Sequence, residues 1–118
     1  MDLRITDMMA MQKVLHQMHE GEWFPLEPAY GQHTILYMIE EIGEVIAILK
    51  KKGDQSVIND PAVRNAFIEE IADVLMYYTD TLLRYQVTPE ELTNAFLKKH
   101  EKNMHRNFAE EYREKYNG

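Results

Sequence analysis

Apolar residues recur every three or four positions over four long stretches of this sequence, and no other feature constrains the fold as strongly. The stretches cover residues 3–19, 31–52, 61–84 and 89–108. Such spacing places apolar side chains along one side of an α-helix, whereas a strand would alternate apolar and polar residues. The sequence therefore predicts an all-α, four-helix-bundle-like domain with short connections between its helices.

The residues between these stretches are of the types that begin and end helices. Gly53 follows three lysines, and both glycine and cations are common at a helix C-terminus. The pairs Asp60-Pro61 and Thr88-Pro89 each combine an N-cap residue with proline at the first helical position. The boundary signals and the apolar spacing therefore predict the same helices.

The length and composition limit the class of protein. A chain of 118 residues fits one domain, with a core over about residues 3–108 and a charged tail at 109–118 that we expect to fray. The net charge of −7 argues against binding to long nucleic acids or to anionic membranes. The absence of cysteine excludes disulfides and thiol catalysis. No apolar run is long enough to span a membrane, and the first residues do not resemble a signal peptide, so we expect a cytoplasmic protein.

The third stretch is unusually apolar for a helix of so small a domain. Over residues 61–84, apolar side chains occupy about two thirds of the circumference of the predicted helix. Such a helix has to be covered on several sides, and a single domain of this size offers few partners. We therefore expect a homodimer or homotetramer with the central helices at its interface.

A short acidic motif occurs twice. Residues 40–45 read EEIGEV and residues 69–74 read EEIADV, and each copy places two carboxylates three positions apart on one helical face. Two bare carboxylates 4 Å apart would repel by about 4 kcal/mol at an effective dielectric constant of about 20. Shared protons or a hard cation would relieve this repulsion, and ligands that are all oxygens favour Mg²⁺ or Mn²⁺ over zinc or copper. The predicted metal ligands are Glu41, Glu44, Glu70 and Asp73.

The acidic residues have two alternative interpretations. Paired acids on a helix are commonly solvated side chains that form surface ion pairs. A di-iron carboxylate bundle would need a Glu followed three positions later by His, and this sequence contains no such pair. The apolar neighbours of both motifs favour an enclosed metal site.

The acidic pattern resembles that of a known family. E-E-x-x-E followed after a gap by E-x-x-D is similar to the pattern of the all-α nucleoside triphosphate pyrophosphohydrolases, the MazG-like group. The last predicted helix also carries K-x-x-x-N-x-x-R, at Lys99, Asn103 and Arg106. The resemblance covers about residues 31–106 closely and the preceding segment more loosely.

The resemblance implies a Mg²⁺-dependent enzyme that hydrolyses a nucleoside triphosphate, including non-standard ones, between the α and β phosphates to a monophosphate and pyrophosphate. It implies that the four acids hold the metal and act in catalysis, and that Lys99, Asn103 and Arg106 bind phosphates. A phosphoribosyl-ATP pyrophosphatase or a dUTP/dCTP pyrophosphatase of the same superfamily stays open. So does a non-enzymatic helical module whose acids lie at the surface.

Three further residues are candidates for contact with the base or sugar. Tyr77 lies one helical turn beyond Asp73 on the same side of the predicted helix. Trp23 lies in a proline-containing loop before the second helix, where it could stack on a base. His16 lies on the first helix near that loop. For each, core packing is the alternative interpretation.

Overall fold

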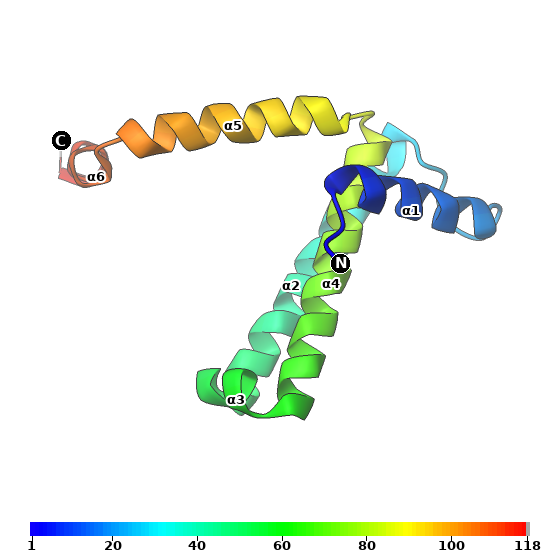
Figure 1. Ribbon diagram of the computed structural model, residues 1–118, viewed down its shortest axis with the longest axis horizontal. Coiled ribbons are helices and arrows are strands. Elements are labelled where there is room, and N and C mark those ends of the chain that lie inside the picture. Colours follow the sequence, from blue (N-terminus) through cyan, green and yellow to red (C-terminus); the bar gives the residue numbers. More distant parts are fainter. Residues whose placement is uncertain (118) are drawn as a thin grey trace. The chain divides into compact units, whose positions relative to one another are not determined.

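The computed structural model describes residues 1–117, and within them the chain is all-helical with no β-strand. The all-α prediction is confirmed. The chain divides into two compact units, Met1–Val87 and a second that begins at Thr88, and each is described by itself. The helices, labelled in Figure 1, are α1 (Ile5–Met18), the 3₁₀ turn η1 (Pro28–Tyr30), α2 (Gly31–Lys52), α3 (Asp54–Asn59), α4 (Pro61–Arg84), α5 (Pro89–His105) and α6 (Phe108–Asn117).

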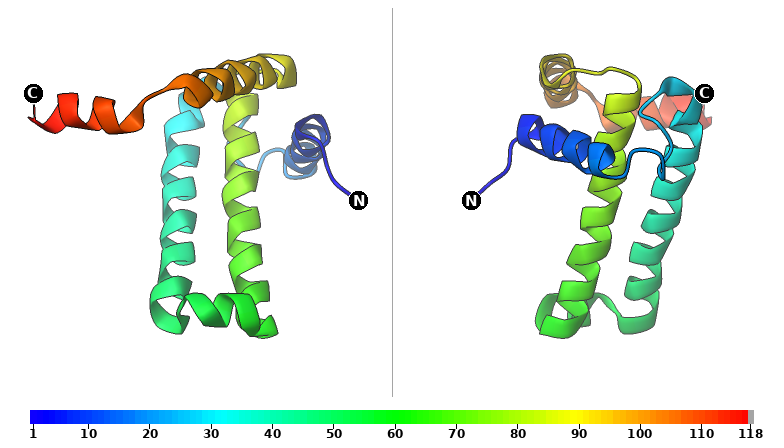
Figure 2. Two further views of the ribbon diagram at one scale, coloured as in Figure 1. Left: turned by 60° about the vertical axis from the view of Figure 1, so that its left-hand side comes forward. Right: turned by 90° about the vertical axis from the view of Figure 1, so that its right-hand side faces the viewer.

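The first unit is built on a pair of long antiparallel helices. In both views of Figure 2, α2 and α4 run side by side, and the short helix α3 joins them at one end. Helix α1 crosses α4 near the other end of the pair, and it packs against α4. This arrangement brings the two acidic motifs, one on each long helix, to neighbouring positions. Among residues 1–117 no helix is long and apolar enough to cross a membrane.

The predicted helix ends are present in the structure. Gly53 follows α2 with a φ of 86°, a left-handed conformation that favours glycine. The side chain of Asp60 accepts a hydrogen bond of 3.0 Å from the backbone of Ala62. Thr88 and Glu91 form a reciprocal capping box with two bonds of 3.1 Å. The local sequence therefore sets these boundaries.

Two helices were not predicted. Helix α3 spans six residues, too few for apolar spacing to reveal a helix. The tail at 109–118 was expected to fray, but the structure has helix α6 over Phe108–Asn117, while residue 118 lies outside the described part. Helix α6 is supported by an ion pair of 2.8 Å between Arg106 and Glu111 and by contact between the rings of Tyr112 and Tyr116, whose centroids are 4.6 Å apart.

Few apolar side chains are buried. Among the described residues, the buried apolar core consists of Met9, Val57 and Leu82, which are 6–9 % exposed. A row of isoleucines on α2 and a similar row on α4 remain partly exposed. Their members are Ile39, Ile42 and Ile46 on α2, and Ile68, Ile71 and Leu75 on α4.

Gly31, the first residue of α2, allows a close approach of Tyr85. A β-carbon at position 31 would lie 2.2 Å from the hydroxyl oxygen of Tyr85. We expect Gly31→Ala to displace this ring and to lower the free energy of unfolding by about 1–3 kcal/mol. Gly43→Ala, also in α2, is the matched control, because a β-carbon there meets nothing within 4 Å. The control should raise stability by up to about 1 kcal/mol through helix propensity.

The comparison is made by chemical denaturation of the two variants and the unchanged protein. Equal stability of Gly31→Ala and Gly43→Ala would contradict the close packing of Tyr85 against the start of α2.

Candidate functional site

Three carboxylates meet between the long helices. One oxygen from each of Glu41, Glu70 and Asp73 lies within 4.8 Å of the others. Glu70 and Asp73 are three residues apart on α4, so they share one face of that helix. Glu41 reaches them from α2. The packing of α2 on α4 therefore converts two local acidic patterns into one three-dimensional group.

The electrostatics of this group favour a proton or a cation. The pKa of Glu41 is raised from its ordinary value of 4.5 to about 6, first by a hydrogen bond with Glu70, then by burial and by the charges of Glu70, Asp73 and Glu44. Oxygen Oε2 of Glu70 is buried and has no hydrogen-bond partner among the described residues. A buried, unpartnered carboxylate oxygen beside two more carboxylates is a suitable donor set for a hard divalent cation. The residues present thus fit Mg²⁺ or Mn²⁺.

Glu44, the fourth predicted ligand, is exposed and does not belong to this group of three. It follows Glu41 by three residues, which turns its side chain about 60° around the helix axis away from that of Glu41. Its charge still contributes to the raised pKa of Glu41. The structure therefore brings three of the four predicted ligands together and places the fourth beside them.

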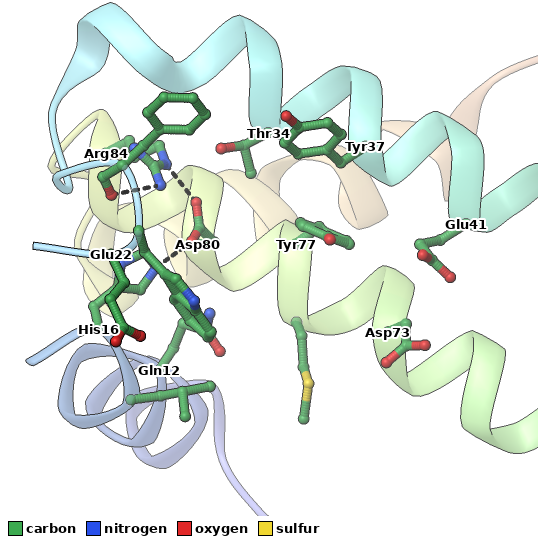
Figure 3. A pocket seen from close by; sticks show the side chains of 14 residues that line it. Gln12, His16, Glu22, Thr34, Tyr37, Glu41, Asp73, Tyr77, Asp80 and Arg84 are labelled. Atoms are coloured by element: carbon green, nitrogen blue, oxygen red, sulfur yellow. Dashed lines mark hydrogen bonds and ion pairs between the residues drawn. The ribbon is translucent and has the colours of Figure 1, made fainter. Parts of the chain in front are cut away.

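A cavity of about 540 Å³ extends from the acidic group (Figure 3). Glu41 and Asp73 line one end of it. The rings of Tyr37 and Tyr77 follow, with their centroids 6.0 Å apart. The other end is both aromatic and polar, and its lining includes Gln12, His16, Trp23, Phe24, Thr34, Asp80 and Arg84.

All three residues predicted to contact the base or sugar line this cavity. The ring of Trp23 lies edge-on to that of His16, with 5.2 Å between the ring centroids. It stacks on the ring of His19, with 4.2 Å between the centroids. Burial raises the pKa of Tyr77, and the negative charges of Glu41 and Asp73 raise it further. The hydroxyl of Tyr77 therefore stays protonated and can donate a hydrogen bond.

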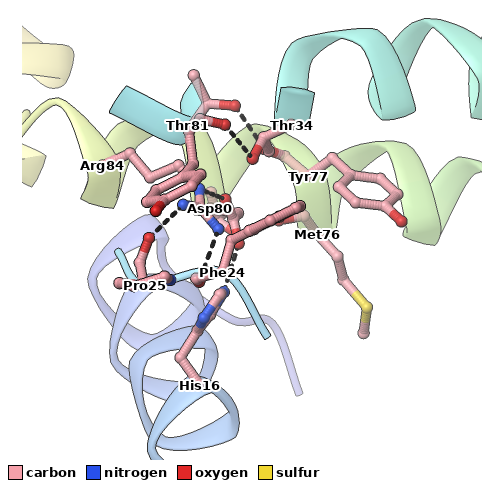
Figure 4. A network of polar contacts seen from close by, with 11 residues as sticks. His16, Phe24, Pro25, Thr34, Met76, Tyr77, Asp80, Thr81 and Arg84 are labelled. Atoms are coloured by element: carbon pink, nitrogen blue, oxygen red, sulfur yellow. Dashed lines mark hydrogen bonds and ion pairs between the residues drawn. The ribbon is translucent and has the colours of Figure 1, made fainter. Parts of the chain in front are cut away.

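Sequence reasoning missed a buried ionic cluster at the aromatic end, shown in Figure 4. Asp80 pairs with His16 through Oδ2 and with Arg84 through Oδ1. Both Asp80 and Arg84 are almost completely buried, at 5 % and 3 % exposure. Asp80 and Arg84 follow Asp73 and Tyr77 at helical spacing, so all four residues share one face of α4. This spacing is the sequence pattern that could have indicated the cluster. From the sequence, both are assigned only to the polar part of the helix over residues 61–84.

The three predicted phosphate-binding residues belong to the second unit. Lys99 and Asn103 lie on α5, and Arg106 caps its C-terminus. Asn103 accepts a hydrogen bond of 3.2 Å from Arg106, which also pairs with Glu111. All three lie on the exposed surface of their unit, and their role in phosphate binding stays a prediction.

Comparisons of the chain with protein-family models, with curated proteins and with solved structures give no match. Function is therefore inferred from the site itself.

The raised pKa of Glu41 makes the stability of the metal-free protein depend on pH. Because the folded protein holds this proton more tightly than the unfolded chain, the associated stability is present below about pH 4.5 and is lost as the pH rises through about 6. Glu41→Gln, which cannot ionise, should escape this loss. Its melting temperature relative to the unchanged protein should therefore increase between acidic and neutral pH.

The measurement is thermal denaturation in the presence of a chelator. Glu69→Gln is the matched control, because Glu69 is an exposed acid on the same helix as Glu70. A difference between Glu41→Gln and the unchanged protein that does not vary with pH would contradict the shared proton.

Proposed function

We propose that this protein is a Mg²⁺-dependent nucleoside triphosphate pyrophosphohydrolase of the MazG-like type. In this proposal it hydrolyses its substrate between the α and β phosphates and releases a monophosphate and pyrophosphate. The observation that carries the proposal is the group formed by Glu41, Glu70 and Asp73, with a buried unpartnered oxygen, at the end of an aromatic cavity.

The acidic group would hold the metal on which such a reaction depends. Glu41, Glu70 and Asp73 supply the oxygen ligands, and Glu44 can complete the set or accept a proton from the attacking water. When bound, a divalent cation polarises phosphoryl oxygens, lowers the pKa of bound water and offsets the carboxylate charges that would repel a polyphosphate. Mn²⁺ can substitute because it accepts the same oxygen ligands.

The remainder of the cavity would orient the nucleoside. The volume of about 540 Å³ lies within the range of about 300–1,000 Å³ usual for small-molecule sites. Phosphates at the acidic end would leave the sugar near Tyr77 and the base near Trp23 and His16. Base stacking on an aromatic side chain contributes about 1–3 kcal/mol. Following the resemblance, Lys99, Asn103 and Arg106 would bind the β and γ phosphates.

The central test is a panel of standard and modified nucleoside triphosphates assayed for pyrophosphate. We expect pyrophosphate release that requires Mg²⁺ or Mn²⁺, and we expect Asp73→Asn to reduce kcat/KM by about 100-fold or more through loss of a metal ligand. Glu69→Gln, the exposed neighbour of the site, should retain nearly full activity.

Release of phosphate alone would contradict cleavage between the α and β phosphates. No turnover on any nucleotide would count against an enzyme and favour the non-enzymatic helical module. Full activity of a folded Asp73→Asn variant would show that the ligand assignment is wrong.

We also propose that the protein is a homodimer or homotetramer. The segments 39–46 and 68–75 share the pattern I-E-E-I-[GA]-[ED]-V-[IL], so each long helix carries large apolar residues at the same four positions, three of which form the exposed rows. These rows are partly exposed, with Ile39 at 56 % and Ile68 at 50 %. Because antiparallel helices with equal rows have approximate twofold symmetry, a second copy offers a matching surface.

We expect light scattering to give the mass of two or four chains for the unchanged protein. Ile39→Glu should shift this mass toward that of one chain, because it places a charge in the apolar contact. Ile58→Glu is the matched control, since Ile58 is equally exposed but lies on α3, outside both rows. A monomeric mass of the unchanged protein at micromolar concentrations would contradict this assembly.

A further inference from the structure

One buried carboxylate joins two helices of the first unit. Asp80 on α4 pairs with His16 on α1 and with Arg84 one turn further along α4. The exposed fractions of the three residues are 9 % or less. Buried charges of this kind persist only where they are paired and hydrogen-bonded.

Arg84 extends this cluster to the loop that carries Trp23. Its Nε donates to Oδ1 of Asp80 at 2.5 Å, its Nη1 donates to the carbonyl oxygen of Pro25 at 2.5 Å, and its Nη2 donates to that of Phe24 at 3.4 Å. Figure 4 shows the guanidinium between the carboxylate and the loop. One side chain thus links the loop backbone to α4, across about 60 positions of sequence.

The loop that carries Trp23 is attached to two helices, and Trp23 lies at the aromatic end of the cavity. The backbone N–H of Trp23 donates to the carbonyl of His19 at 3.0 Å, which ties the loop to α1. The indole ring stacks on the imidazole of His19. Arg84 holds the next two carbonyls from the opposite side. The position of the indole therefore depends on both attachments.

We propose that Arg84 is a positioning residue for ligand binding, because it fixes the loop at which Trp23 lines the cavity. This inference rests on the proposed function for the identity of the ligand, a nucleotide whose base stacks at this end. Arg84 acts through the loop and not on the reacting phosphates. Its loss should weaken binding and leave the rate of the bound substrate nearly unchanged.

The geometry distinguishes this positioning role from mere neutralisation of Asp80. Neutralisation requires only a positive charge, which lysine also supplies. Three directed bonds to a carboxylate and two carbonyls require the planar fork of a guanidinium. Arg84→Lys should therefore keep the fold while releasing the loop. Arg84→Met removes both functions and leaves the buried Asp80 without its guanidinium partner, so it should also destabilise the protein.

The single tryptophan of the chain gives a direct readout, because all indole emission arises from Trp23. In the ligand-free protein we expect Arg84→Lys to shift this emission to longer wavelength and to increase its quenching by acrylamide, at a nearly unchanged melting temperature. With the best nucleotide of the panel and Mg²⁺, KM should rise by roughly tenfold, the loss expected when one base–aromatic stack is weakened. The value of kcat should stay within about twofold. Arg64→Lys is the matched control, since Arg64 is exposed on the same helix.

Each outcome bears on one claim. Emission, quenching and KM of Arg84→Lys equal to those of the unchanged protein would overturn the positioning role and leave Arg84 as the counter-charge of Asp80. A fall in kcat at constant KM would also overturn it. If the unchanged protein hydrolyses no nucleotide, the proposed function fails, while the emission and quenching measurements still decide whether Arg84 holds the loop.

Discussion

The antiparallel packing of α2 against α4 is the interaction on which the rest of the first unit depends. It places Glu41 opposite Glu70 and Asp73 and so concentrates negative charge between two helices. Local apolar contact has to offset this repulsion in the absence of a cation. The raised pKa of Glu41 means that a proton shares in the compensation only below about pH 6. A stable arrangement of this kind favours a ligand that brings positive charge, which is the physical basis of the proposed metal site.

The cavity extends from this charged group to an end that is lined by aromatic side chains and by a paired carboxylate. At its far end another carboxylate, Asp80, pairs with the guanidinium of Arg84 and with the ring of His16. Two acidic positions on one face of α4 therefore have different surroundings, and only Asp80 is buried. Asp80 is satisfied within the protein and holds segments together, whereas the group at Asp73 retains an unpartnered oxygen and is open to an external ligand.

The small apolar core gives the exposed isoleucine rows their significance. With Met9, Val57 and Leu82 as the buried apolar residues of the described chain, the long helices have little internal apolar contact from which to derive stability. Burial of the rows on a second copy would supply it, at about 25 cal/mol for each Å² of apolar surface removed from water. Assembly and stability are then linked, and the acidic group would lie in a scaffold that the oligomer makes rigid.

The sequence by itself determined the helical class, the bounds of α2 and α4 and the helix caps, because apolar spacing and capping residues act through neighbours only a few positions away. It also identified the two acidic pairs. Helix α3 escaped because six residues make fewer than two turns. Which acids meet was decided by the tertiary structure, since the rotation of α2 against α4 brings in Glu41 and leaves Glu44 exposed. The burial of Asp80 and Arg84 was likewise invisible in the sequence, because their partners His16 and Pro25 lie 64 and 59 positions away. The spacing of residues within a helix determines which side chains share a face. Only the packing of helices decides whether that face meets another charge, a cavity or water.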